Sequence, residues 1–175
     1  MNTTLRILAC AAALLAASAA NATTYNFSYT FSERFSGQGT SLVTGSFDGT
    51  ASGNLITDLT NISVFRDGEQ FGSGNLYSFL FTGRSPAVAS FDGLENNFLF
   101  STSSYQIGGG NYNGNTFGIS TQYHDAYVQG GNGGARGDNY SATRWSVTAV
   151  PEPATYAMLL GGLGLVGAMV RRRAV

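Results

Sequence analysis

Side chains suited to acid–base or nucleophilic chemistry are few in this 175-residue chain. The one histidine, His124, directly precedes Asp125, but adjacent residues of a strand point to opposite faces, so the two are not a preformed dyad. The chain has no lysine, which excludes a phosphate-binding loop ending in Gly-Lys-Ser/Thr, and no serine stands in Gly-x-Ser-x-Gly. We expect no enzymatic activity and no cofactor, and we interpret His124 as a solvated residue of a loop or strand end.

Carboxylates leave one catalytic alternative open. Nine of them lie between residues 23 and 149, and two that meet in space could act on a glycosidic bond as a hydrolase or lyase. The sequence favours no pair, because most of these acids stand beside glycine or asparagine, where turns form. Residues 48–54 have the outline of a calcium loop but lack a second carboxylate and a terminal glutamate, so we predict a turn there and no metal site.

Tyrosines gather in and around two Gly/Asn-rich stretches, residues 108–115 and 130–139, which we predict to be mobile loops. A tyrosine ring can stack on a sugar while neighbouring amides bind its hydroxyls, so we hypothesise a glycan-binding surface. The alternative is that these are ordinary half-buried tyrosines of a β-protein. An Arg-Gly-Asp tripeptide at 136–138 matches a cell-adhesion motif, which we interpret as a chance match. The candidate glycan-binding residues are Tyr105, Tyr112, Tyr123 and Tyr127, with Tyr140 nearby.

The most specific pattern occupies residues 150–175. Pro151 and Pro153 flank Glu152 and hold the preceding residues extended, the form that a protease or transpeptidase cleft can bind. Residues 154–170 carry no charge, and a helix of that length reaches roughly 25 Å, the lower limit for crossing a hydrocarbon core. We therefore predict a processing motif followed by a transmembrane helix.

An arginine cluster follows the apolar run. Arginines are retained on the cytoplasmic side, so the body of the protein is expected outside that membrane. The motif, the helix and the cluster together resemble the PEP-CTERM sorting signal of Gram-negative bacteria. The resemblance implies that the chain is a substrate of the membrane enzyme exosortase, cleaved near Pro-Glu-Pro, in bacteria that make exopolysaccharide and biofilm. The alternative is an ordinary anchor that is never processed. The residues that carry this resemblance are Pro151, Glu152, Pro153, Arg171, Arg172 and Arg173.

Residues 1–22 predict a signal peptide. Arg6 supplies the charged region, residues 7–17 the apolar region, and Ala20 and Ala22 the small-x-small pattern that signal peptidase recognises. Cleavage would make Thr23 the first residue of the mature protein.

The only cysteine, Cys10, falls within that signal peptide. The alternative of a lipoprotein acceptor at Cys10 is disfavoured, since Leu8 fits poorly near such a cleavage bond. Removal of Cys10 with the signal peptide would exclude disulfides, thiol catalysis and cysteine metal sites from residues 23–149. That segment has five arginines against nine acids, a balance of −4, and so lacks the charge that nucleic-acid binding needs.

Residues 23–149 predict one all-β domain. Aromatic residues alternate with polar ones over 25–31, and similar short runs recur at 40–47, 55–65, 76–82, 87–91, 97–101, 116–127 and 140–150. The 55–65 run allows two short strands, and the 116–127 run allows one strand or a hairpin near His124. Asp-Gly pairs at 48, 67 and 92 predict tight turns. This spacing indicates an antiparallel β-sandwich or jelly roll, with Trp145 in its core.

We therefore expect an exported protein that crosses the inner membrane transiently and reaches the cell envelope or extracellular matrix. Signal peptidase and exosortase would be its processing partners. Its expected role is structural or adhesive, with exopolysaccharide as the candidate ligand and no nucleic acid. A secreted glycan hydrolase or lyase and an unprocessed membrane-tethered domain are the alternatives.

Overall fold

The computed structural model describes residues 22–32, 39–71, 75–81, 86–102, 114–130, 133–151 and 161–162. The predicted signal peptide, apart from Ala22, and the predicted helix 154–170, apart from two helical glycines, lie outside these residues. Among the residues described, no helix is long and apolar enough to span a membrane.

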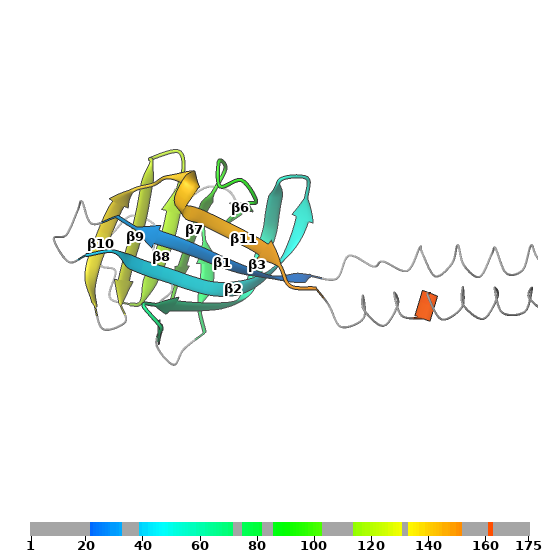
Figure 1. Ribbon diagram of the computed structural model, residues 1–175, viewed down its shortest axis with the longest axis horizontal. Coiled ribbons are helices and arrows are strands. Elements are labelled where there is room, and N and C mark those ends of the chain that lie inside the picture. The colour runs from blue at the N-terminus through cyan, green and yellow to red at the C-terminus, as the bar shows by residue number, and fades with distance from the viewer. Residues whose placement is uncertain are drawn as a thin grey trace, which may run out of the picture.

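Two antiparallel sheets stack face to face in the domain (Figure 1). The first sheet has the order β11 (Trp145–Ala149), β1 (Thr23–Phe31), β2 (Ser41–Ser52), β3 (Leu55–Arg66) and β4 (Glu69–Gln70), and β6 (Ala89–Ser90) also pairs with β3. The second has the order β10 (Gly133–Asn139), β9 (Asp125–Gly130), β8 (Thr116–Ser120), β7 (Asn97–Ser101) and β5 (Tyr77–Phe79). Consecutive strands are mostly neighbours, so each sheet is largely a meander rather than the Greek key of a jelly roll.

Aromatic side chains fill the space between the sheets. β1 confirms its predicted alternation, because its four aromatic residues are all less than 5% exposed. The Phe27 ring lies 5.7 Å from the ring of Phe117 in the opposite sheet and 5.7 Å from that of Trp145. Trp145 is in the core, as predicted, and its indole N–H donates to the carbonyl of Ser90 at 2.9 Å. Each such ring contributes roughly 1.5–3 kcal/mol through burial.

The observed turns agree only in part with those predicted at the Asp-Gly pairs. Asp67 and Gly68 form the predicted tight turn, with φ values of 51° and 87°. The turn predicted at Asp48 is wrong, since Asp48 lies within β2 and the chain reverses at Gly53. The physical reason is that the Asp48 carboxylate is satisfied inside the sheet, where it accepts from Thr24 at 2.6 Å and from Asn61 at 2.7 Å.

Two strand alternatives are settled. β3 is one continuous strand, whose ladder with β2 shifts register around Asp48. The 116–127 run is a hairpin, with a turn at 121–124 where His124 has φ of 52°.

The mobile loop predicted over 130–139 is wrong for the described residues 133–139, which form edge strand β10. Arg136 and Asp138 point inward between the sheets, and are 4% and 5% exposed. Of the other predicted loop, only Gly114 and Asn115 lie within the described residues.

Candidate functional site

The processing motif begins where the β-ladder ends. β11 pairs with β1 in the register Tyr25↔Ala149, and the N–H of Val150 donates to the carbonyl of Thr24 at 2.8 Å. Pro151 follows at once and is exposed. The first proline of Pro-Glu-Pro is therefore one residue beyond the last hydrogen bond to the folded sheet.

The position of Pro151 explains why a proline is tolerated there. In an antiparallel ladder the N–H groups of successive residues point alternately towards and away from the partner strand. Val150 donates towards β1, so the nitrogen of residue 151 faces the free edge of β11, where a missing N–H removes no ladder bond. The ladder thus continues up to the motif without a linker.

The predicted signal-peptidase junction lies at the same end of the domain. β1 begins at Thr23, and Ala22 before it is exposed. Figure 1 shows β1 and β11 side by side, with the start of β1 and the end of β11 at the same end of the sandwich. The structure therefore brings the two predicted processing sites into one region, although they are more than a hundred residues apart in the sequence. Of the predicted processing residues, Ala20, Glu152, Pro153 and Arg171 to Arg173 lie outside the described residues.

The candidate tyrosines occupy different environments. Tyr123 is 62% exposed in the turn before β9, whereas Tyr127 is half-buried within β9. The Tyr127 hydroxyl donates to Oε1 of Gln129 at 2.6 Å, and burial raises the pKa of Tyr127. Tyr105 and Tyr112 lie outside the described residues, and Tyr140 is packed against Tyr29 with ring centroids 5.5 Å apart. Of the candidates that the structure describes, Tyr123 thus has the more open ring.

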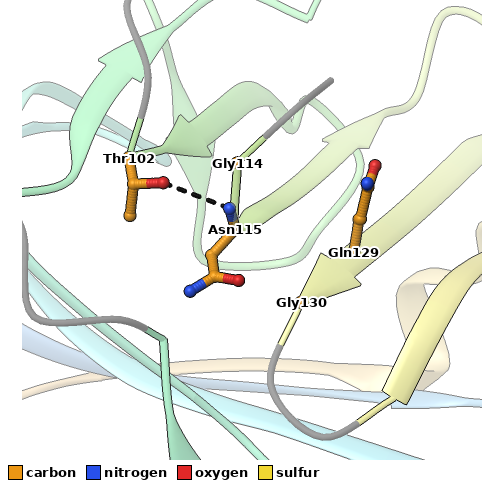
Figure 2. A pocket seen from close by; sticks show the side chains of 5 residues that line it. All are labelled: Thr102, Gly114, Asn115, Gln129 and Gly130. Atoms are coloured by element: carbon orange, nitrogen blue, oxygen red, sulfur yellow. Dashed lines mark hydrogen bonds between the residues drawn. The ribbon is translucent and has the colours of Figure 1, made fainter. Parts of the chain in front are cut away.

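An open polar cavity of about 440 Å³ lies near one end of the second sheet. The hydroxyl of Thr102 accepts from the backbone N–H of Asn115 at 3.1 Å. Figure 2 shows that contact, with the side-chain amides of Asn115 and Gln129 pointing in different directions on either side of the hollow. Sequence reasoning missed this cavity, because its residues flank a Gly/Asn-rich stretch and form no motif of their own. It is lined by Thr102, Gly114, Asn115, Gln129 and Gly130.

Of the candidate tyrosines, Tyr127 lies next to this cavity, because its hydroxyl donates to the cavity residue Gln129. Tyr123, by contrast, precedes the opposite end of β9 from the cavity residue Gly130. Amide and hydroxyl groups in an open hollow are suited to binding neutral, hydroxyl-rich ligands.

The Arg-Gly-Asp tripeptide is built into the fold. Asp138 accepts from the Ser32 N–H at 2.6 Å and the Ser32 hydroxyl at 2.9 Å, and it pairs with Arg144. Arg136 donates to the backbone carbonyls of Ser32 and Gly39. Because both charged side chains face inward, they are unavailable to a receptor. This burial agrees with the interpretation of the tripeptide as a chance match to a cell-adhesion motif.

The described carboxyl groups differ in their environments. Hydrogen bonding from Asn61 and Thr24 lowers the pKa of Asp48, and bonding from Asn54 and Leu94 lowers that of Asp92. Burial instead raises the pKa of Asp125. His124 is exposed beside it. Among the described residues, no three His, Cys, Asp or Glu side chains are grouped to hold a metal ion.

Comparison with known proteins assigns the tail. Residues 149–173 match the PEP-CTERM protein-sorting motif. This match begins at the last residue of β11 and takes in the prolines and the arginine cluster. No curated protein and no solved structure matches the chain.

Proposed function

Because the chain carries a PEP-CTERM motif and is thereby an exported target of exosortase, we propose that its β-domain is released from the membrane to act in the cell envelope or extracellular matrix. Its role there is structural or adhesive, through weak contacts with exopolysaccharide. The inner membrane is its transient location, and signal peptidase removes the leader. The tail is severed near Pro151.

The junction with the motif carries the proposal. Val150 is still bonded to β1, so cleavage at or just after Pro151 would leave the whole sandwich intact. One core spans both sheets, and a domain with its own core can fold and persist after release. A cut at this place therefore frees a complete unit.

The open cavity supports the choice of ligand. Neutral amide and hydroxyl groups line it, and the exposed Tyr123 ring offers a separate stacking surface on the same hairpin. Stacking on an aromatic ring is worth about 0.5–1.5 kcal/mol. Such contacts are individually weak, which is suited to adhesion through many copies.

The first experiment is the intact mass of the protein recovered from its native host, separated into membrane and medium. We expect a chain that starts at Thr23 and ends between residues 150 and 153, with or without an added group. A chain that retains Val175 in the membrane fraction would contradict processing and favour the membrane-tethered alternative.

Retention of the freed domain on immobilised host exopolysaccharide tests the binding role. Tyr123→Ala and Gln129→Ala should each weaken retention roughly 2–10-fold, the equivalent of one lost stacking or polar contact. Leu42→Ala is the control, because Leu42 is 44% exposed on β2, in the other sheet from the cavity residues and from the turn that carries Tyr123. Equal retention of all three variants and the unaltered domain would refute the glycan-binding surface.

A glycan hydrolase or lyase that uses a carboxylate pair is the second candidate, and Asp125 is the residue to test first because burial raises the pKa of its carboxyl group. It predicts new reducing ends during incubation with the polysaccharide, abolished by Asp125→Asn. Retention without new ends would favour the adhesive role.

A further inference from the structure

Two arginine side chains, one from each sheet, lie buried inside the domain. Arg66 belongs to β3 and Arg136 to β10, and they are only 5% and 4% exposed. Nε of Arg66 donates to the hydroxyl of Ser41 at 3.3 Å, and Arg136 donates to the carbonyl of Gly39, two residues earlier. The two guanidinium groups therefore lie in the same part of the interior.

Arg66 bonds mainly to neutral groups. It donates to the backbone carbonyls of Gly130 at 3.2 Å and of Gly134 at 2.8 Å. A carboxylate oxygen of Asp67 lies 3.9 Å from its Nε, but the Asp67 side chain is 53% exposed, so solvent weakens this attraction. Burial lowers the pKa of Arg66, the charge of Asp67 opposes this effect, and the charge of Arg136 adds to it. Repulsion between the two arginines is thus only partly offset.

Arg136 forms no ion pair within the part of the chain that the structure describes. It donates to the carbonyl of Ser32 at 3.1 Å, and its buried Nε has no hydrogen-bond partner among the described residues. Arg144, by contrast, forms an ion pair with Asp138. Arginine is effectively always charged, and a buried charge is costly unless it is paired. The described interior around Arg136 is therefore one negative charge short.

The open cavity meets this arginine pair at Gly130. Figure 2 shows Gly130 at the end of β9, beside the hollow. The carbonyl of this residue is one that accepts from Arg66. The other polar side chains of the lining are the hydroxyl of Thr102 and the amides of Asn115 and Gln129. The cavity thus combines neutral polar groups with a guanidinium that lies behind a single carbonyl.

From this arrangement we propose that the cavity binds an acidic sugar, whose carboxylate is held by Arg66 and Arg136. A guanidinium bonds roughly twice as strongly to a carboxylate as to a neutral acceptor. A carboxylate therefore displaces the Gly130 carbonyl from Arg66, whereas a sugar hydroxyl does not. The inference rests on the proposed function and narrows its ligand to a polysaccharide that carries uronic acids.

Binding of small probes to residues 23–150, which contain the whole core, tests this site. The probes are a tetrasaccharide of glucuronic acid, the same tetrasaccharide with its carboxyl groups reduced to alcohols, and inorganic phosphate. Titration calorimetry measures the dissociation constant of each probe. We expect the acidic tetrasaccharide to bind at least about ten times more tightly than the reduced one, the difference that one hydrogen bond to a charged group makes.

Variants assign this preference to the arginine pair. Arg66→Gln and Arg136→Gln should each reduce the affinity for the acidic tetrasaccharide to that for the reduced one. Arg144→Gln is the matched control, because it removes the same charge from an arginine that already has a carboxylate partner. Circular dichroism checks that each variant is folded. The comparison of probes on the unaltered domain needs no variant, so it stands even where a variant does not fold.

Equal affinity for the two tetrasaccharides would overturn the inference and leave the proposed function intact. Phosphate binding as tight as that of the acidic tetrasaccharide would also overturn it, because the pair would then hold small free anions. So would an equal loss of preference in Arg144→Gln and Arg136→Gln, since net charge would then select the acid. If neither tetrasaccharide binds, the inference fails, and retention on host exopolysaccharide decides whether the proposed function fails with it.

Discussion

Asp138 ties the edge strand β10 to the rest of the sandwich. Its two carboxylate oxygens accept from the Ser32 backbone, the Ser32 hydroxyl and Arg144. Burial alone would raise the pKa of Asp138, but the bonds from Arg144 and Ser32 outweigh burial and hold it below its ordinary value. The charged form is therefore the one that the fold stabilises.

Asp138→Asn should lower the free energy of unfolding by about 2–3 kcal/mol, because a neutral amide cannot replace the hydrogen bonds made to a charged acceptor. Urea unfolding of residues 23–150 measures the change. Asp58→Asn is the matched control, since Asp58 is exposed and has φ of 56°, a conformation that asparagine also accepts. A loss below about 0.5 kcal/mol in Asp138→Asn would show that this network contributes little.

Among the elements, β2 depends on a close approach to its neighbours. A Cβ atom at Gly45 would lie 2.1 Å from the Ser63 carbonyl oxygen and 2.6 Å from Cζ of Phe27. Gly137 in edge strand β10 has no other heavy atom within 4 Å of the same position. The two glycines thus differ in the space around them.

Gly45→Ala should cost about 2–3 kcal/mol of unfolding free energy, because the strand or the Phe27 ring must move. Gly137→Ala should be neutral or stabilising by up to about 1 kcal/mol, since it only reduces the freedom of the unfolded chain. The two midpoints are compared by thermal unfolding. Similar midpoints would contradict the close packing of β2 on β3.

The strands that the sequence predicts are those with apolar side chains facing inward. β1 shows this pattern as an alternation of buried and less buried residues and begins two residues before its predicted range, and β7 has its predicted bounds and is almost wholly buried. β10 has the same alternation, but its inward residues are Arg136 and Asp138, so its pattern has the polarity of a loop. Inward-pointing charges also protect an edge strand from pairing with other chains.

The candidate sites were likewise predicted only where their residues form a local pattern in the sequence. The Pro-Glu-Pro motif is local in sequence and was predicted, and its lack of a linker is confirmed by the Val150 bond. The pairing of β1 with β11 and the cavity at Gln129 depend on residues far apart in the chain, whose register a single sequence does not specify.

Over the whole domain, stability should fall at both ends of the pH range. The pKa values of Asp48, Asp92 and Asp138 are lowered in the fold, so their contribution is present above the unfolded value of about 3.9 and is lost as the pH falls through the folded values. Burial raises the pKa of Tyr29 to about 12. Its contribution is present below the unfolded value of about 10 and is lost as the pH rises towards 12.

Urea midpoints plotted against pH from 2 to 12 should therefore show a plateau that falls at both the acid and the alkaline end. Single variants identify the groups responsible for each fall. Asp48→Asn should lower the midpoint at pH 7, where the carboxylate accepts from Asn61 and Thr24, and this difference should close near pH 2, where Asp48 is itself protonated. Tyr29→Phe should make the arm between pH 10 and 12 shallower, because one buried phenol fewer then has to ionise, while Tyr127 and Tyr140, whose pKa values burial also raises, keep the rest of the arm. A difference for Asp48→Asn that persists unchanged at pH 2 would mean that the replacement of one accepting oxygen by an NH2 group, and not the loss of charge, destabilises the variant.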